Sequence, residues 1–238
     1  MNIIRYLEKA LKAHKTAAYF KTFISKGDLC FDLGANVGEI TDVLLRIGAR
    51  VVAVEPQESC LKILRRKYDG NQQVAIVGAA VGRMEKEDSL MICEETTEAA
   101  TLSNIFVGTY GPASRLSYLT TEKVKVTTLE RLILEHGVPH FCKIDVEGYE
   151  SEVFIGLNTP IKFISFEFNI LLLKDTLKCL LLLSALGDYQ CNFLEYEHMK
   201  PVLPEWMEIL EFRSQLYEFI TEDILTGEII VRLSVNGQ

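Results

Sequence analysis

Four residues near the start of the chain have the types and spacing of a ligand-binding turn. In FDLGANVGEIT, residues 31–41, these residues are Asp32, Gly34, Asn36 and Gly38. Glycines allow a tight backbone turn and the close approach of a ligand. A helix that follows such a turn offers free amides and the positive end of its dipole. The stretch therefore predicts a nucleotide-binding turn between a strand and a helix that begins near Val37.

The acid in this turn indicates which nucleotide fits. A dinucleotide site has the fingerprint G-x-G-x-x-G, whereas this chain has G-A-N-V-G, with Asn36 in place of the middle glycine. The carboxylate of Asp32 would repel a pyrophosphate and attract an ammonium group. A ligand with an amino-acid head group, a nucleoside and no phosphate therefore fits better than NAD does. S-adenosylmethionine (SAM) is such a ligand.

A second acid supports the same ligand. Glu55 ends the apolar run VVAVE, 17 positions after Gly38. In folds that bind nucleotides at a glycine turn, an acid at this place accepts hydrogen bonds from the ribose hydroxyls. The alternative is an ordinary connection between a strand and a helix, but the combination of Asp32 and Glu55 favours a binding site.

A further acidic cluster follows in KIDVEGYE, residues 143–150. Asp145 and Glu147 come at the carboxyl end of a strand that should neighbour the first one, and alternate residues of a strand share a face. Glu167 ends the next strand, in ISFEF. These acids could serve as a base for an incoming hydroxyl, bind a divalent cation, or hydrogen-bond a polyhydroxylated acceptor. No metal ligand set can be read from the sequence, and Glu147 could instead only charge the first turn of the next helix.

Alternating strands and helices are expected to position these residues. Short buried strands are predicted at LCFDL, ARVVAVEP, VAIVGAAVG, PHFCKIDV and IKFISFEFN, with helical stretches between them. This order predicts an α/β fold with a mostly parallel sheet and helices on both faces, in one domain over residues 27–238. Residues 1–26 predict a basic amphipathic helix, and packing on this domain is favoured over contact with a membrane or a partner.

Residues 83–122 interrupt this alternation. They contain one expected strand, SLMICEE, followed by small and hydroxyl residues and a stretch that contains glycines. No long helix is expected there. An insertion of this kind tends to line a binding site, and we expect it to form the acceptor side of this one.

Composition argues against several classes of protein. The chain of 238 residues is 48% hydrophobic and 24% charged with a net charge of −8, which disfavours binding to nucleic acid through a basic surface. The six scattered cysteines favour free thiols in a reducing compartment over disulfides or a zinc site. Charged residues interrupt both the first residues and the apolar segment NILLLKDTLKCLLLLSAL, so neither a signal peptide nor stable membrane insertion is expected. We expect a cytoplasmic protein.

Taken in order, the motifs resemble those of the FkbM-type SAM-dependent methyltransferases. The resemblance covers roughly residues 27–170 and rests on FDLGANVGEIT, VVAVEP, AAVG, VKVTTLERLI, FCKIDVEGYESEVFIGL and ISFEFN. It implies a Rossmann-like, seven-stranded class I methyltransferase fold with a reversed last strand, which GEIIVRL would supply. It also implies SAM as the methyl donor and, most often, O-methylation of a hydroxyl of a sugar, polyketide or other small natural product.

The resemblance further implies roles for single residues. The turn on the methionine side of SAM is matched by Asp32, Gly34, Asn36 and Gly38. The acid that binds the ribose is matched by Glu55, and the acids nearest the transferring methyl by Asp145 and Glu147.

Two alternatives to a methyltransferase stay open. One is an NAD(P)-dependent oxidoreductase on a related fold, and the other is a non-catalytic SAM-binding protein. The sequence indicates neither the methyl acceptor nor the oligomeric state. Many relatives have a polar residue where this chain has Gly78 or Ala79, so contact with the adenine is expected from the backbone.

Overall fold

The structure, a computed structural model, describes residues 3–195, 200–220 and 225–234 of the chain. Five parallel strands form one side of its large sheet, out to the edge strand β3: β1 (Leu29–Leu33), β2 (Arg50–Val54), β3 (Val74–Val77), β7 (Phe141–Ile144) and β8 (Phe163–Asn169). β1 pairs with β2 on one side and with β7 on the other, β2 pairs with β3, and β7 pairs with β8. The predicted adjacency of the KIDV strand and the first strand is confirmed.

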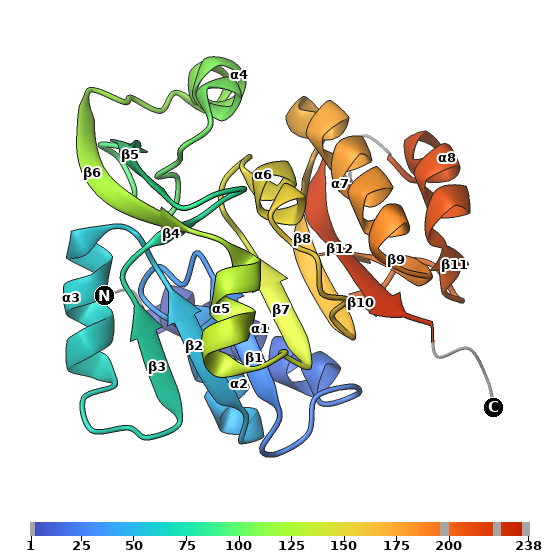
Figure 1. Cartoon of the computed structure of the whole chain (residues 1–238), viewed down its shortest axis with the longest axis horizontal. Helices are drawn as coiled ribbons and strands as arrows, with labels where there is room; N and C mark the ends of the chain where they lie inside the picture. The colour runs from blue at the N-terminus through green and yellow to red at the C-terminus, as the bar shows by residue number, and fades with distance from the viewer. Residues whose placement is uncertain (1–2, 196–199, 221–224, 235–238) are drawn as a thin grey trace.

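The last strand of the chain runs against this direction. β12 (Thr226–Leu233) lies antiparallel between β8 and β9 (Tyr189–Glu195), so GEIIVRL is the reversed last strand that was predicted. The two-residue strands β10 (Lys200–Pro201) and β11 (Met207–Glu208) pair with β9. The strand order is β10-β9-β12-β8-β7-β1-β2-β3, and the α/β fold class with a mostly parallel sheet is confirmed (Figure 1).

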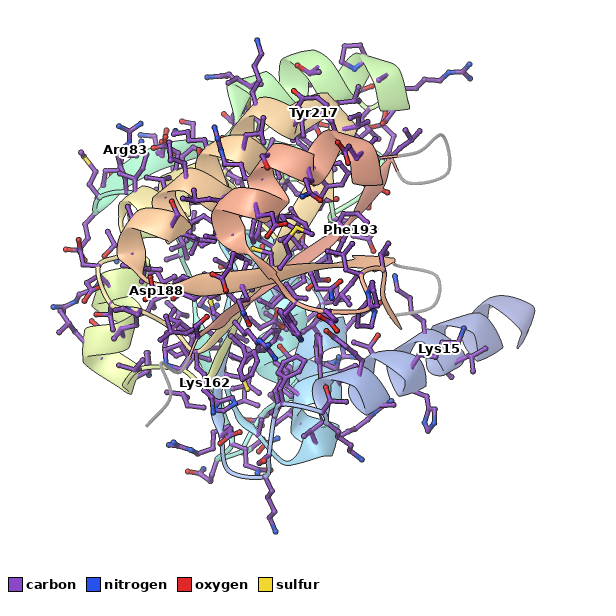
Figure 2. All side chains as sticks on the ribbon, turned by 90° about the vertical axis from the view of Figure 1, so that its right-hand side faces the viewer. Lys15, Arg83, Lys162, Asp188, Phe193 and Tyr217 are labelled. Carbon is purple, nitrogen blue, oxygen red and sulfur yellow. The ribbon has the colours of Figure 1, made fainter. Side chains whose placement is uncertain are left out.

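Helices cover one face of the sheet from β1 to β9. They are α5 (Leu129–His136), α6 (Glu150–Ile155), α7 (Leu173–Leu186) and α8 (Ile209–Phe219), with the short 3₁₀ helix η1 (Ile170–Leu172) before α7. Their apolar sides share one core cluster with Phe31 and Ile144 of the sheet. Figure 2 shows α7 and α8 side by side on this face. None of the helices in the described ranges has the length and apolar character needed to cross a membrane.

The other face carries α1 (Ile3–Phe20), α2 (Glu39–Ile47) and α3 (Glu58–Lys67). Phe20 of α1 and Leu44 of α2 pack with Cys30 and Phe141 of the sheet. Successive residues of a strand point to opposite faces. Asp32, two residues after Cys30, therefore points toward α1 and α2.

The insertion at residues 83–122 lies apart from the large sheet, at one end of it (Figure 1). β4 (Ala80–Val81), β5 (Lys86–Ile92) and β6 (Thr120–Thr127) form a separate sheet in the order β4-β6-β5. The insertion also contains a helix of 11 residues, α4 (Asn104–Ser114), so the expectation of no long helix there is wrong.

Tertiary contacts explain why α4 forms. Its sequence, NIFVGTYGPAS, contains glycines and a proline, which are poor helix formers. The hydroxyl of Ser103 caps the helix by accepting a hydrogen bond from the Phe106 amide at 3.1 Å. Phe106 is fully buried in a cluster with Leu172. Capping and burial outweigh the weak propensity, and the burial of Phe106 could not be read from the local sequence.

A binding crevice is expected next to β1, where the order in which the chain adds strands to the sheet reverses. From β1 the chain proceeds outward to β2 and β3, and it later returns to the other side of β1 as β7. Ligands of open α/β sheets bind outside the carboxyl ends of the strands at such a point. The loop after β7 contacts the end of β1 there, because the Asp145 amide donates to the Leu33 carbonyl oxygen at 3.0 Å.

Candidate functional site

Two cavities open at this crevice and share a wall. The Glu55 cavity is bounded by Glu55, Ala79 and Tyr149, among others. The Asp32 cavity has a volume of about 350 Å³, and Asp32, Thr16 and Lys143 are among its lining residues. The residues common to both cavities are Gly34, Asn36, Glu98, Asp145 and Glu147. The predicted turn and the predicted acidic cluster therefore meet in one site.

Asp32 lies at the buried end of its cavity, with 2% of its surface exposed. One carboxylate oxygen accepts a hydrogen bond from the Thr41 hydroxyl of α2 at 2.6 Å. Burial raises the pKa of Asp32 to about 6, although the Thr41 hydrogen bond and the charge of Lys143 oppose the rise. The carboxylate is thus fixed in position and poorly solvated, and a cationic group of a ligand would favour its charged form.

The glycine turn is shaped by the protein's own packing. Gly34 has φ +81° and Gly38 has φ +82°, a region that side chains disfavour. A Cβ on Gly34 would lie 1.8 Å from the Asp145 carbonyl oxygen, and one on Gly38 would lie 2.5 Å from the Tyr68 hydroxyl. Gly34 lines both cavities. Gly38 lines neither and caps α2, which begins at Glu39, two residues after Val37.

Glu55 is held by the same turn. Its two carboxylate oxygens accept hydrogen bonds from the Asn36 amide and the Gln57 amide, each at 2.8 Å. Burial raises the pKa of Glu55 to about 7, against the effect of these two hydrogen bonds. Each carboxylate oxygen has capacity for another donor. Glu55 can therefore accept two hydroxyl groups of a ligand in its cavity.

The three predicted acids lie close together, but the alternation of side chains along a strand is not the reason. Oxygen atoms of Asp145, Glu147 and Glu167 all lie within 4.8 Å of one another. β7 ends at Ile144, so Asp145 and Glu147 belong to a loop. Glu147 has φ +54°, and its carbonyl oxygen accepts a hydrogen bond from the Thr101 hydroxyl at 2.7 Å. A loop held by the insertion therefore presents Glu147.

Burial and neighbouring acids act in the same way on two members of this cluster, Glu147 and Glu167. Burial, and then the charges of Glu167 and Asp145, raise the pKa of Glu147 well above its ordinary value. Burial, and then the charges of Asp145 and Glu150, raise the pKa of Glu167 in the same way. Glu150 has a structural role, because it accepts hydrogen bonds from the amides of Val146 at 3.2 Å and Gly148 at 3.3 Å. Glu150 rather than Glu147 thus holds the loop ahead of α6.

Lys143 belongs to the site although the sequence analysis did not identify it. Its side chain is buried in the middle of β7, lines the Asp32 cavity and donates to Asp145 Oδ2 at 3.0 Å. Burial lowers its pKa, but the charges of Asp145 and Glu228 outweigh burial and hold the pKa above the ordinary value. The signal in the sequence was a lysine inside the otherwise apolar strand FCKI.

Glu228 of β12 was also missed. It is 3% exposed, lines the Asp32 cavity and is the register partner of Glu167 on β8. Its Oε2 lies 4.0 Å from Lys143 Nζ. Its Oε1 makes no hydrogen bond within the described parts of the chain. The signal was an acid at the start of the apolar run IIV, but its partner could not be known without the sheet order.

The insertion contributes to both cavities. The hydroxyl of Thr97 donates to the side-chain oxygen of Asn36 at 3.1 Å. Glu98 lines both cavities, whereas Thr97 and Thr101 line only the Glu55 cavity. The insertion therefore closes over the Glu55 side and reaches the Asp32 side through Glu98.

Comparison with known proteins identifies the family. The family model described as "Methyltransferase FkbM domain" matches residues 32–219, and no curated protein matches the sequence. A solved precorrin-6y C5,15-methyltransferase from Geobacter metallireducens is 11% identical, with 95% of this chain and 87% of that chain covered and a TM-score of 0.48. A TehB-like SAM-dependent methyltransferase from Corynebacterium glutamicum is 9% identical, with 92% and 88% covered and a TM-score of 0.46.

The two solved structures are too distant to indicate an activity for this chain. The family match, in contrast, spans most of the chain and includes the glycine turn, Glu55 and the acidic loop. The resemblance seen in the sequence motifs is thereby confirmed, and the chain belongs to the FkbM methyltransferase family.

Proposed function

We propose that the chain transfers a methyl group from SAM to a hydroxyl group of a sugar, a polyketide or another small natural product. The observation that carries the proposal is the placement of two fixed carboxylates, Asp32 and Glu55, in adjoining cavities. No lysine, arginine or histidine is among the described residues that line the Glu55 cavity. Such a site suits a ligand with an ammonium group and a ribose better than one with a pyrophosphate.

The donor would extend from one cavity into the other, past the residues that line both. Its ammonium group would lie near Asp32, its ribose hydroxyls would donate to Glu55, and its adenine would lie beside Ala79 and Ala80. The sulfonium methyl would then lie near Gly34 and the acidic loop, because these residues line both cavities. Fixed carboxylates on both sides favour the cationic donor over its neutral product.

The chemical step needs alignment more than activation, because the sulfonium already makes the methyl group reactive. The acceptor oxygen attacks the methyl carbon in line, a C–O bond forms, and the C–S bond breaks with its electron pair left on sulfur. The hydroxyl proton passes to Asp145 or Glu147 as transfer proceeds. Lys143 keeps Asp145 in place through its 3.0 Å hydrogen bond.

The acceptor would enter the Asp32 cavity from the side formed by α1 and the insertion. Lys12 and Thr16 of α1 and Glu98 of the insertion line this side. We propose that these three residues select the acceptor. Their mixture of polar groups suits a small hydroxylated molecule better than a nucleic acid. The six cysteines, all free and buried, support a reducing compartment such as the cytoplasm.

Calorimetry of the full chain with SAM, S-adenosylhomocysteine and NAD tests the donor. Binding of SAM and S-adenosylhomocysteine is expected, and binding of NAD alone would support the oxidoreductase alternative instead.

A library of sugar and polyketide hydroxyl compounds with tritiated SAM tests the acceptor class. If Asp145→Asn binds SAM and keeps full transfer activity, the proposed role of Asp145 is wrong. If the wild type binds SAM but labels no hydroxyl compound, the non-catalytic alternative gains support.

A further inference from the structure

Glu147 has a backbone conformation that its own side chain does not favour. Its φ is +54°, in the left-handed region that glycine, and less often Asn or Asp, adopts most readily. Two other non-glycine residues of the described chain have a positive φ, and each has a local reason. Asn36 is of a favoured type, and Arg115 lies at the end of α4, where helices commonly finish in this region. A contact from elsewhere must therefore hold Glu147.

The peptide unit that joins Glu147 to Gly148 is held from both sides. Its N–H donates to Glu150 Oε1 at 3.3 Å, which is long for such a hydrogen bond. Its carbonyl oxygen accepts from the Thr101 hydroxyl at 2.7 Å. Glu150 alone would hold only one end of this peptide unit, so the shorter bond from Thr101 fixes its orientation.

Thr101 is itself fixed on the small sheet. Its side chain is buried, and its hydroxyl accepts a hydrogen bond from the Ser103 amide at 2.8 Å. A hydroxyl has one hydrogen to donate, and here it is directed at Glu147. The backbone of Thr101 pairs with Met91 of β5 through hydrogen bonds of 2.9 and 3.0 Å. The hydroxyl thus reaches the acidic loop from a defined position.

The helix α4 contacts the same loop. A Cβ on Gly148, which has φ +79°, would lie 3.0 Å from the Cβ of Phe106. Phe106 is fully buried and therefore offers little room to move. The insertion thus packs against Gly148 and hydrogen-bonds Glu147, so it determines where this acid lies.

We infer that Thr101 is a positioning residue, whose hydroxyl holds Glu147 in its left-handed conformation and so keeps the carboxylate in the site. Glu147 lines both cavities, and one of its oxygens lies within 4.8 Å of oxygens of Asp145 and Glu167. Without the hydroxyl, the peptide unit would rotate and the carboxylate would leave this cluster. The placement of Glu147 rests on the contacts alone, whereas its use in methyl transfer rests on the proposed function.

An NMR titration of the full chain, with ¹³C at the side-chain carboxyl of glutamate, tests the position of Glu147. Its signal is identified by its loss in Glu147→Gln. Burial, and then the charges of Glu167 and Asp145, raise the pKa of Glu147, so the pKa reports whether the carboxylate stays in the cluster. Thr101→Val and Thr101→Ala remove the hydroxyl and should lower this pKa toward its ordinary value. Thr101→Ser retains the hydroxyl and should keep the wild-type pKa, as should the matched control Thr121→Val at an exposed position of β6.

The charged groups around Glu147 are the same in all these variants. They are Lys143, Asp145, Glu150 and Glu167, with Glu98 of the insertion in the same cavities. Thr101→Ala adds no methyl group, so it stays informative if Thr101→Val does not fold. The inference is overturned if the folded variants without the hydroxyl keep the wild-type pKa of Glu147, or if Thr101→Ser lowers it as much as they do.

Transfer kinetics with an acceptor from the hydroxyl library test the role in the reaction. Thr101→Val should lower kcat about tenfold to a hundredfold, since a misplacement of about 1 Å can cost this much. The Kd for SAM, measured by calorimetry, should stay unchanged, and Thr101→Ser should retain the wild-type kcat. In Glu147→Gln, the further change Thr101→Val should have little effect, because the residue through which Thr101 acts is already altered.

The two readouts separate this inference from the proposed function. If the wild type binds no SAM or methylates no hydroxyl compound, the proposed function fails, and the NMR titration still decides whether Thr101 positions Glu147. If the wild type transfers methyl groups and Thr101→Val does so at the same rate, the role of Thr101 in the reaction is wrong and the proposed function stands.

Discussion

Asp32 and Lys143 are register partners on the adjacent parallel strands β1 and β7, and both side chains are buried. Lys143 donates its hydrogen bond to Asp145 rather than to Asp32, yet its charge opposes the rise in the pKa of Asp32. One buried ammonium group thus stabilises the carboxylate proposed to bind the donor and the carboxylate proposed to act on the acceptor. The two functions share an electrostatic support.

Lys143→Met should therefore destabilise the fold. It removes a buried charge and leaves Asp145 and Glu228 without their ion-pair partner. Breaking a fully buried pair costs about 3–5 kcal/mol, and the loss here should lie below that range because the Asp145 side chain is 36% exposed. Urea denaturation at pH 7 measures the free energy of unfolding. Lys125→Met, at an exposed position of β6, should change it by no more than about 0.5 kcal/mol. Equal stability of the two variants would show that Lys143 does not compensate these acids.

Asp32→Asn should weaken SAM binding with little change in the cavity's shape. A hydrogen bond to a charged group contributes about 1.5–3 kcal/mol, so the dissociation constant should rise about tenfold to a hundredfold. Asp69→Asn, at an exposed position after α3, is the matched control. Isothermal titration calorimetry measures both. A dissociation constant unchanged by Asp32→Asn would contradict the proposed contact with the ammonium group.

SAM affinity should also depend on pH. The pKa values of Asp32, about 6, and Glu55, about 7, are raised mainly by burial, and both acids would bind the donor in their charged forms. Each group is increasingly protonated as the pH falls through its pKa. Affinity should therefore be greatest near pH 7.5 and fall toward pH 5.5, by up to about tenfold per pH unit for each group below its pKa.

Titration calorimetry at four pH values between 5.5 and 7.5 measures this dependence. In Glu55→Gln the group that titrates near pH 7 is absent, so the affinity should be lower at pH 7.5 but should change less between pH 7.5 and 6.5. A wild-type affinity that is constant over the whole range would mean that neither acid binds the donor as a carboxylate.

The parts of the site that sequence could predict are those determined within one strand and its following turn. Asp32 lies near the end of a short apolar strand, and Gly34 and Glu55 directly follow one, so their place at the carboxyl edge was readable from local pattern. Glu147 was predicted for the wrong reason, because its left-handed φ of +54° and its support by Thr101 depend on the insertion. Glu147 does lie beside Asp145 and Glu167, but the loop after β7 and not strand alternation places it there.

The contacts that sequence could not predict join distant segments. Glu228 meets Glu167 only because β12 lies between β8 and β9, and its register fixes which residues face each other. Lys143 looked like an irregularity in an apolar strand until the partner carboxylates were placed around it. The helix α4 likewise depends on burial of Phe106 against Leu172. Long-range register and tertiary burial decided each of these features.

Gly34→Ala should show how closely the two loops of the site approach each other. Its new Cβ would lie 1.8 Å from the Asp145 carbonyl oxygen, so the loop after β7 must move. The alanine would also be strained at φ +81°. Gly70 has φ +71° with no atom within 4 Å of the equivalent Cβ, so Gly70→Ala measures the backbone strain alone. That strain is about 1–2 kcal/mol, and Gly34→Ala should cost about 2 kcal/mol more, since such overpacking costs about 1–3 kcal/mol. Urea denaturation of both variants measures the difference, and equal losses would mean that the loop after β7 yields freely and does not define the wall between the two cavities.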